Sequence, residues 1–205
     1  ISQIPFTYPV VLEPEVVRYL RRFRGRSKPT IASWLARMGQ YQTLIETELQ
    51  QADCPPELIA VAMIESGFSP DAYSRAGAVG VWQFMLPTAL SLGARVDDWV
   101  DERRHVQAST RLAARLLKEN YQRFGSWHLA LAAYNAGAGT VSRAIKKGGT
   151  NDYWRLIRAR LLPREASNYV PKAIASMIAI RRPDLVGLDT VVLTTPPVTA
   201  TVSVS

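Results

Sequence analysis

Cysteine and histidine are scarce in this chain of 205 residues. The single cysteine, Cys54, excludes an internal disulfide framework, although it does not exclude an oxidising compartment. The two histidines, His105 and His128, are too few for a histidine-based metal site, and one cysteine does not make up the shortage. We therefore expect no metal and no other cofactor.

Long apolar runs are also missing. The longest are stretches such as residues 58–64, whereas a membrane span needs about 18–20 apolar residues. We expect no transmembrane segment in this chain. The sequence starts with Ile1 and shows no signal-peptide pattern, which predicts a processed or trimmed chain.

Positive charge and apolar residues are plentiful. Lys and Arg number 25 against 17 Asp and Glu, which gives a formal net charge of +8, and arginine supplies 20 of the cations. Hydrophobic residues make up 47%, which excludes disorder over most of the chain and allows one domain with a real core. The excess charge favours an anionic partner: nucleic acid, a membrane surface or an anionic polysaccharide.

Helical spacing of apolar residues runs through most of the chain, without sustained strand alternation, and predicts an all-α body. Cys54-Pro55-Pro56 forces a stop and a restart, and a compact loop is expected over residues 71–80 and another over 146–149. After residue 183 the chain becomes rich in Thr, Val and Pro, which predicts an extended tail. The helices are expected at residues 13–23, 31–38, 41–51, 57–66, 82–92, 106–124, 127–136, 153–160 and 165–181.

Glu65 breaks the apolar pattern of its helix. It lies seven residues after Leu58 and four after Val61, so its carboxyl projects from an otherwise apolar face. Burial raises the pKa of a carboxyl and keeps it protonated near neutrality, as a general acid requires. A structural glutamate paired with an arginine or a helix N-terminus fits the same spacing.

Three sequence blocks follow one another in a recognisable order. The first runs Glu65-Ser66-Gly67-Phe68, continues with Ser74 nine positions after Glu65, and ends in GAVGVWQFM at residues 77–85. The second is AYNAG at residues 133–137, and the third is EASNYVPK at residues 165–172. Together they resemble the signature of lytic transglycosylases of the soluble-lytic type, bacterial enzymes that cleave peptidoglycan. The resemblance covers about residues 55–182.

One departure indicates a branch of that family. Val81-Trp82 stands before Gln83 where the family usually has Leu-Met, which is similar to the membrane-bound D-type branch. The helices expected over residues 13–51 also look like that branch. The resemblance implies a lysozyme-like (goose-type) domain at 55–183, an N-terminal arm and helices at 1–54 packing on it, and a linker-like tail at 184–205.

The resemblance also implies a reaction. The β-1,4 bond between N-acetylmuramic acid and N-acetylglucosamine would break to give a 1,6-anhydromuramoyl end, with Glu65 as the single acid and base and with help from the substrate acetamido group. The residues alone offer no obvious second carboxylate, since Asp71 suits a solvated turn. The implied substrate-binding residues are Ser66, Ser74, Gln83, Met85, Tyr134, Asn135, Glu165 and Tyr169.

Several of these residues have structural interpretations as well. Ser66 can bond back to its own helical turn, and Ser74 can cap a loop. Tyr169 can be a core aromatic residue with a satisfied hydroxyl, and Glu165 can be the acidic residue of a helix N-terminus. Tyr134 suits a hydroxyl aimed at Glu65.

Other functions are weaker matches. A muramidase that hydrolyses the same bond on a similar fold is the closest alternative, followed by a non-catalytic wall-binding module. The incomplete dinucleotide fingerprint at residues 137–142 follows a helix rather than a strand. The arginines at residues 18–26 lack any companion nucleic-acid motif, which favours a solvated face.

The implied partner is therefore the glycan strand of peptidoglycan, with no nucleic acid. We expect a monomer in the periplasm or cell envelope, in which an association with the outer membrane would fit. A lipid anchor or a LysM module would lie outside these residues.

Overall fold

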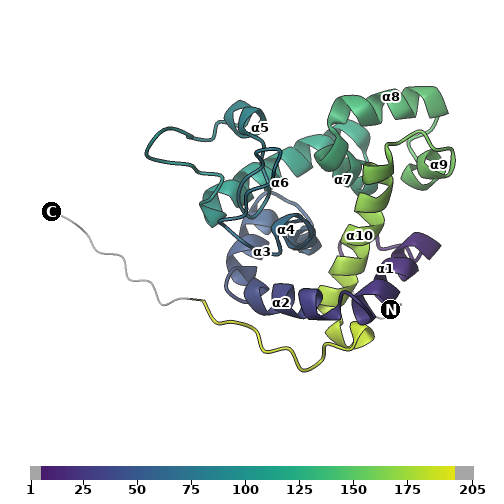
Figure 1. Cartoon of the computed structure of the whole chain (residues 1–205). Coiled ribbons are helices and arrows are strands. Elements are labelled where there is room, and N and C mark those ends of the chain that lie inside the picture. Colours follow the sequence, from purple (N-terminus) through teal and green to yellow (C-terminus); the bar gives the residue numbers. More distant parts are fainter. Residues whose placement is uncertain (1–5, 197–205) are drawn as a thin grey trace.

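Helices make up nearly all of the regular structure in residues 6–196, the part of the chain that this computed structural model describes. Within that part, β-structure is limited to isolated bridges such as the one between Val79 and Phe84. The prediction of an all-α body is confirmed. The elements (Figure 1) are α1 (Pro14–Arg24), α2 (Lys28–Met38), α3 (Gln42–Gln51), η1 (Pro56–Leu58), α4 (Ile59–Ser66), α5 (Leu86–Ser91), α6 (Val106–Phe124), α7 (Trp127–Ala136), α8 (Ala138–Gly148), α9 (Tyr153–Arg158), α10 (Arg164–Arg181) and η2 (Pro183–Val186).

The helix expected over residues 82–92 is wrong in its first half. Gln83 has a φ of 52°, in the left-handed region, and Phe84 exchanges two backbone hydrogen bonds of 3.1 Å with Val79. This tight reversal ends the loop that starts after α4. Helix α5 begins only at Leu86, with Pro87 in its first turn, where a missing N–H costs nothing.

Helix α8 is absent from the sequence-based prediction, which treats residues 146–149 as a loop. The glycines at 137 and 139 mask its start. Its buried side chains, Val141 and Ala144, have helical spacing and pack toward α7. Gly149, with a φ of 62°, ends the helix, so the left-handed turn is one residue long and the lysines before it are helical.

Helix α4 lies at the centre of the fold, as its continuous apolar sequence predicts. Residues 59–63 are each at most 1% exposed. Helix α10 packs against α4, α7 and α1, and many alanines at these contacts let the backbones approach closely. Gly67 ends α4 in the left-handed region with a φ of 60°, and a Cβ there would collide with the indole of Trp34.

The two ends of the described chain lie against this core. Val16 and Phe23 of α1 are buried, and α1 packs on α10 and η2. After η2, the backbone N–H of Thr194 donates to Ala36 O at 2.8 Å, which holds the chain beside α2. No helix within residues 6–196 has both the length and the apolar character that a membrane crossing requires.

Pro171 lies in the middle of α10, where it cannot donate a backbone hydrogen bond to Ser167 O. The hydroxyl of buried Tyr153 lies 3.1 Å from that carbonyl oxygen and 3.1 Å from Ala166 O. Tyr153 therefore supplies the donor that the proline removes, which ties α9 to α10.

Tyr153→Phe is expected to lower the free energy of unfolding by about 1–2 kcal/mol, because a buried carbonyl loses its donor. Urea denaturation followed by circular dichroism measures the change. Tyr121→Phe is the matched control, since the Tyr121 hydroxyl makes no hydrogen bond to another residue of the described range. Equal losses in the two variants would contradict this role of Tyr153.

Candidate active site

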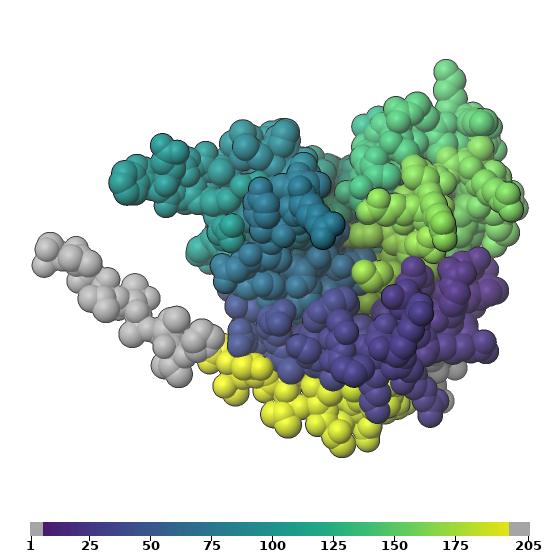
Figure 2. All heavy atoms as spheres, viewed as in Figure 1, coloured from purple at the N-terminus to yellow at the C-terminus, as the bar shows by residue number. Residues whose placement is uncertain are grey.

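A cavity of about 760 Å³ opens beside the C-terminal end of α4. In Figure 2 the surface is hollowed between the part around residues 70–105 and the part formed by α7–α10. Four helices (α1, α4, α7 and α10) and the turn after α1 supply the lining, so its residues are spread along the sequence from Arg18 to Lys172. The lining residues are Arg18, Tyr19, Arg22, Arg26, Ile64, Glu65, Asn135, Arg164, Glu165, Asn168, Tyr169 and Lys172.

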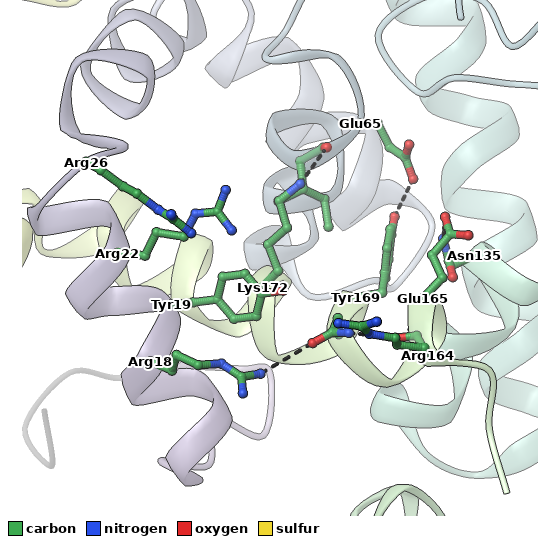
Figure 3. Close-up of a pocket in the computed structure, with 12 residues that line it drawn as sticks. Arg18, Tyr19, Arg22, Arg26, Glu65, Asn135, Arg164, Glu165, Tyr169 and Lys172 are labelled. Carbon is green, nitrogen blue, oxygen red and sulfur yellow. Dashed lines mark hydrogen bonds between the residues drawn. The ribbon is translucent and has the colours of Figure 1, made fainter. Parts of the chain in front are cut away.

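Glu65 lies in the last turn of α4, at the point where the buried helix reaches this cavity (Figure 3). The hydroxyl of Tyr169 donates to its Oε1 at 2.6 Å. Burial is the main influence on the Glu65 pKa and raises it; the Tyr169 hydrogen bond and the positive charge of Lys172 act against that rise, and the charge of Glu165 adds to it. The result is a carboxyl that holds its proton to a higher pH than an exposed glutamate.

Lys172 is a site residue that the sequence-based list omits. Its Nζ donates to Ile64 O at 3.2 Å and lies 6.0 Å from the centroid of the Trp34 ring. Burial lowers its pKa, while the charge of Glu65 raises it. The spacing in the third block could have identified Lys172, because residues 165, 169 and 172 recur at helical spacing and so share one face of α10.

Tyr134 is close to Glu65 but donates its hydroxyl elsewhere. The acceptor is Trp82 O, at 2.8 Å, so the hydroxyl expected to point at Glu65 belongs to Tyr169 instead. Burial raises the Tyr134 pKa well above its usual value, and the charge of Glu65 adds to the effect. The Trp82 indole in turn donates to Thr110 Oγ1 at 2.9 Å, which fixes this loop to α6.

Three of the predicted substrate contacts hold the loop between α4 and α5. Ser66 Oγ donates to Val81 O at 2.8 Å and accepts from Ser69 N, while Ser74 Oγ accepts from Ala78 N at 2.9 Å. The side-chain amide of Gln83 donates to Gly80 O at 2.9 Å. These contacts are all with the chain itself, and none of the three side chains lines the cavity.

Gly80 shows how tightly this loop packs. Its φ is 82°, and a Cβ at this position would collide with the backbone oxygen of Arg103. Only glycine satisfies both conditions. Met85, another predicted contact, lies just beyond, 41% exposed and outside the cavity lining.

Asn135 and Glu165 meet across the cavity from α7 and α10. The Asn135 side-chain amide donates to Glu165 Oε1 at 3.1 Å. Glu165 is in the first turn of α10, where its charge also suits the helix dipole, so the ligand-contact and helix-terminus interpretations are compatible. Glu165, expected as a substrate contact, is also the second carboxyl of the cavity, for which the residues alone had offered no obvious candidate.

Asp71 is not part of the cavity. Its side chain is 92% exposed and lies 3.7 Å from Arg104, as expected for a solvated turn residue. The cavity therefore brings together Glu65, Asn135, Glu165 and Tyr169 from the predicted set.

The arginines of α1 and of the turn after it are exposed, as expected for a solvated face, but three of them also line the cavity. Arg18, Arg22 and Arg26 line the same cavity as Glu65, whereas Arg21 and Arg24 do not. The sequence showed the cluster but could not show that α1 packs on α10 with this face toward α4.

The histidines have local roles. His105 Nδ1 accepts from Ala108 N at the start of α6, and His128 lies 3.0 Å from Pro9 O. Over the described range, no group of three or more His, Cys, Asp or Glu side chains is arranged to hold a metal ion.

Sequence comparison identifies a transglycosylase family model and relatives named as transglycosylases. A family model described as Transglycosylase SLT domain matches residues 42–157. Over 168 residues the chain is 36% identical to membrane-bound lytic murein transglycosylase D of Escherichia coli K12, covering 80% of this chain and 36% of that protein. Over 108 residues it is 33% identical to a transglycosylase of Enterobacteria phage PRD1, covering 52% of this chain and 38% of that protein.

Solved structures agree in fold. The 70 kDa soluble lytic transglycosylase of Escherichia coli matches with a TM-score of 0.63 and 18% identity, over 89% of this chain and 32% of that one. An inactive mutant of the lytic transglycosylase Slt of Pseudomonas aeruginosa matches with a TM-score of 0.61 and 22% identity, over the same shares. The lysozyme-like fold is confirmed, and the chain spans about a third of the length of these relatives.

Proposed function

The chain belongs to the family of transglycosylase SLT domains, and from that premise we propose that its cavity cleaves the β-1,4 bond between N-acetylmuramic acid and N-acetylglucosamine in peptidoglycan. The proposed product is a 1,6-anhydromuramoyl end. The observation that carries the proposal is Glu65, a partly buried carboxyl with a raised pKa that opens into the cavity and receives a 2.6 Å hydrogen bond from Tyr169.

In the first proposed step, protonated Glu65 gives its proton to the glycosidic oxygen. The bond from that oxygen to C1 of the muramic acid breaks, and the oxygen of the 2-acetamido carbonyl bonds to C1 in its place. Such substrate assistance is a recognised exception to the use of two enzyme carboxylates. The burial that raises the Glu65 pKa supplies the proton near neutral pH.

In the second step, the Glu65 carboxylate takes the proton of the O6 hydroxyl. O6 then bonds to C1 and displaces the acetamido oxygen, which closes the 1,6-anhydro ring. Glu65 ends the cycle protonated and no water is consumed. Between the two proposed steps Glu65 is a carboxylate. Tyr169 and Lys172 stabilise this charged form, because one supplies a hydroxyl donor and the other a positive charge near Glu65.

Mass spectrometry of the products tests the proposal. Purified protein incubated with peptidoglycan strands is expected to release muropeptides with anhydro ends, one water lighter than the hydrolysis products. Products with reducing ends only would contradict it.

One observation favours hydrolysis as the second candidate. Glu165 is a second carboxyl in the same cavity, held by Asn135, and hydrolases of this class use two carboxyls with one activating a water. In that case Glu165 would be the base, and the products would carry reducing ends.

We also propose that the protein acts in the cell envelope, where its polymeric substrate is found. Relatives named membrane-bound lytic murein transglycosylases support this location. The charge of +8 suits an anionic wall polymer, although charge alone did not identify it.

A further inference from the structure

Five cations gather around the cavity that contains Glu65. Arg18 and Arg22 are one helical turn apart on α1, and Arg26 continues the same face just past the helix end. Arg164 and Lys172 join them from α10. Figure 3 shows Arg22 and Arg26 extending from the α1 side toward Lys172, with Glu65 beyond it.

None of these five cations has a carboxylate within 4.0 Å in residues 6–196. The contacts of the α1 arginines are neutral and long: Arg18 Nη2 donates to Asn168 Oδ1 at 3.3 Å, and Arg22 Nε donates to Ser27 Oγ at 3.3 Å. Some arginines elsewhere in the described range do have a carboxylate partner, as Arg103 has in Asp101 at 2.8 Å. Four arginines without a carboxylate partner among the described residues therefore line one cavity together with Lys172.

The clustering is unfavourable for the protein alone. Like charges four residues apart destabilise a helix, and the positive charge of Arg22 is among the influences that lower the Lys172 pKa, after burial. Two carboxyls, Glu65 and Glu165, are the only acidic side chains in the lining. An anionic ligand would relieve this excess of positive charge.

The position of the arginines is fixed by packing. Val16 and Phe23 bury one side of α1 against α10 and its surroundings, and Arg18 and Arg22 on the other side line the cavity. Helices α1 and α10, which carry most of the cluster, lie wholly outside residues 42–157, the range that the family model matches.

We propose that Arg18, Arg22, Arg26 and Arg164, here called the arginine wall, bind the carboxylates of the peptide stem carried by N-acetylmuramic acid. This inference rests on the proposed function. Where a stem is attached, the lactyl carboxyl of the sugar is an amide and is neutral, so the negative charge of the substrate is on the acidic residues and the free end of the stem. Guanidinium groups match carboxylates in a two-pronged geometry.

The location favours this ligand over other anions. The arginine wall shares a cavity with Glu65, the carboxyl proposed to act on the glycosidic bond. A stem hangs from the sugar whose bond is cut, so a charge-binding wall beside the reacting carboxyl is where a stem would lie. A lipid surface would instead need the cations on a protruding face.

The double variant Arg22→Gln, Arg26→Gln tests the inference, with Arg21→Gln, Arg24→Gln as the matched control. Both remove two charges from the same short segment, and the control pair does not line the cavity. Each protein is given native stem-bearing strands, the same strands with their carboxylates converted to neutral amides, and strands from which an amidase has removed the stems. Circular dichroism checks that both variants fold.

Wild-type protein is expected to prefer native strands over amidated strands by about tenfold in kcat/KM, a preference that shrinks at high salt. The Arg22→Gln, Arg26→Gln variant should lose that preference, and the control variant should keep it. Stripped strands, which regain one lactyl carboxylate, should behave like the amidated strands.

Four results would overturn the inference. One is a wild type without a charge preference, and another is an equal loss in both variants. The third is an equal preference for stripped and native strands, which would assign the wall to the lactyl carboxylate. Binding to anionic vesicles or duplex DNA that is lost in the Arg22→Gln, Arg26→Gln variant, with the strand preference intact, would also overturn it. A wild type that makes no anhydro product from any strand would instead be a failure of the proposed function.

Discussion

Glu65→Gln is expected to lower kcat/KM on peptidoglycan strands by about 10³-fold, the scale of a lost general acid. The amide matches the carboxyl in size and can still accept the Tyr169 hydrogen bond, but it has no proton to give. In the proposed mechanism the same group acts in both steps, so the substitution removes the acid and the base together. Release of soluble muropeptides from sacculi, followed by chromatography, measures the loss.

The fold is expected to survive this change. Glu65 is partly buried, and a neutral amide avoids the desolvation that burial of a carboxylate entails. The melting temperature of Glu65→Gln should therefore equal or exceed that of the wild type. A sharp fall in melting temperature would assign Glu65 a structural role and remove the basis of the prediction.

Two further variants test whether the loss of activity is specific to the Glu65 carboxyl. Asp71→Asn removes an exposed carboxyl near Arg104 and is expected to keep activity within about twofold. Glu165→Gln removes the other carboxyl of the cavity, and a modest loss with anhydro products supports a single catalytic carboxyl. A loss as large as that of Glu65→Gln would favour the hydrolase, in which two carboxyls are required.

The sequence was most informative about helices with a strong apolar pattern. Helix α4 is apolar almost throughout, so its place in the core and the exceptional character of Glu65 both followed from spacing. Helix α8 escaped detection because glycines surround its start and lysines its end, and only Val141 and Ala144 mark the buried face.

Loop residues were harder to interpret. Ser66, Ser74 and Gln83 belong to the motif, but their polar atoms bond to backbone atoms of the loop. A motif shows that residues occur together without showing whether they touch a ligand or shape the surface that does. The same limit applies to Tyr134 and Tyr169, two buried tyrosines whose different acceptors depend on how α7 and α10 pack.

The arginines of α1 illustrate the remaining gap. Their spacing defines a charged face, and an exposed charged face is ordinarily solvated. Whether it also lines a cavity depends on contacts between α1 and α10, which are more than a hundred residues apart in sequence. No local pattern encodes that orientation.

Tyr169→Phe is expected to lower kcat/KM by about 10- to 100-fold, because it removes a short hydrogen bond to a charged group. The hydroxyl orients the Glu65 carboxyl and stabilises its charged form between the two proposed steps. Burial raises the pKa of Tyr169 well above its usual value, so the hydroxyl keeps its proton throughout the range of the assay. Steady-state kinetics on purified strands measure the loss.

The pH dependence separates this role from a packing role. Glu65 must be protonated to start the reaction, so activity falls as the pH rises through its pKa. The Tyr169 hydrogen bond lowers that pKa; removing it must therefore move the alkaline limb of the kcat/KM profile to higher pH. Tyr134→Phe is the matched control, since its hydroxyl donates to Trp82 O and not to Glu65. An equal movement of the limb in both variants, or a movement to lower pH in Tyr169→Phe, would show that Tyr169 does not tune Glu65 through this bond.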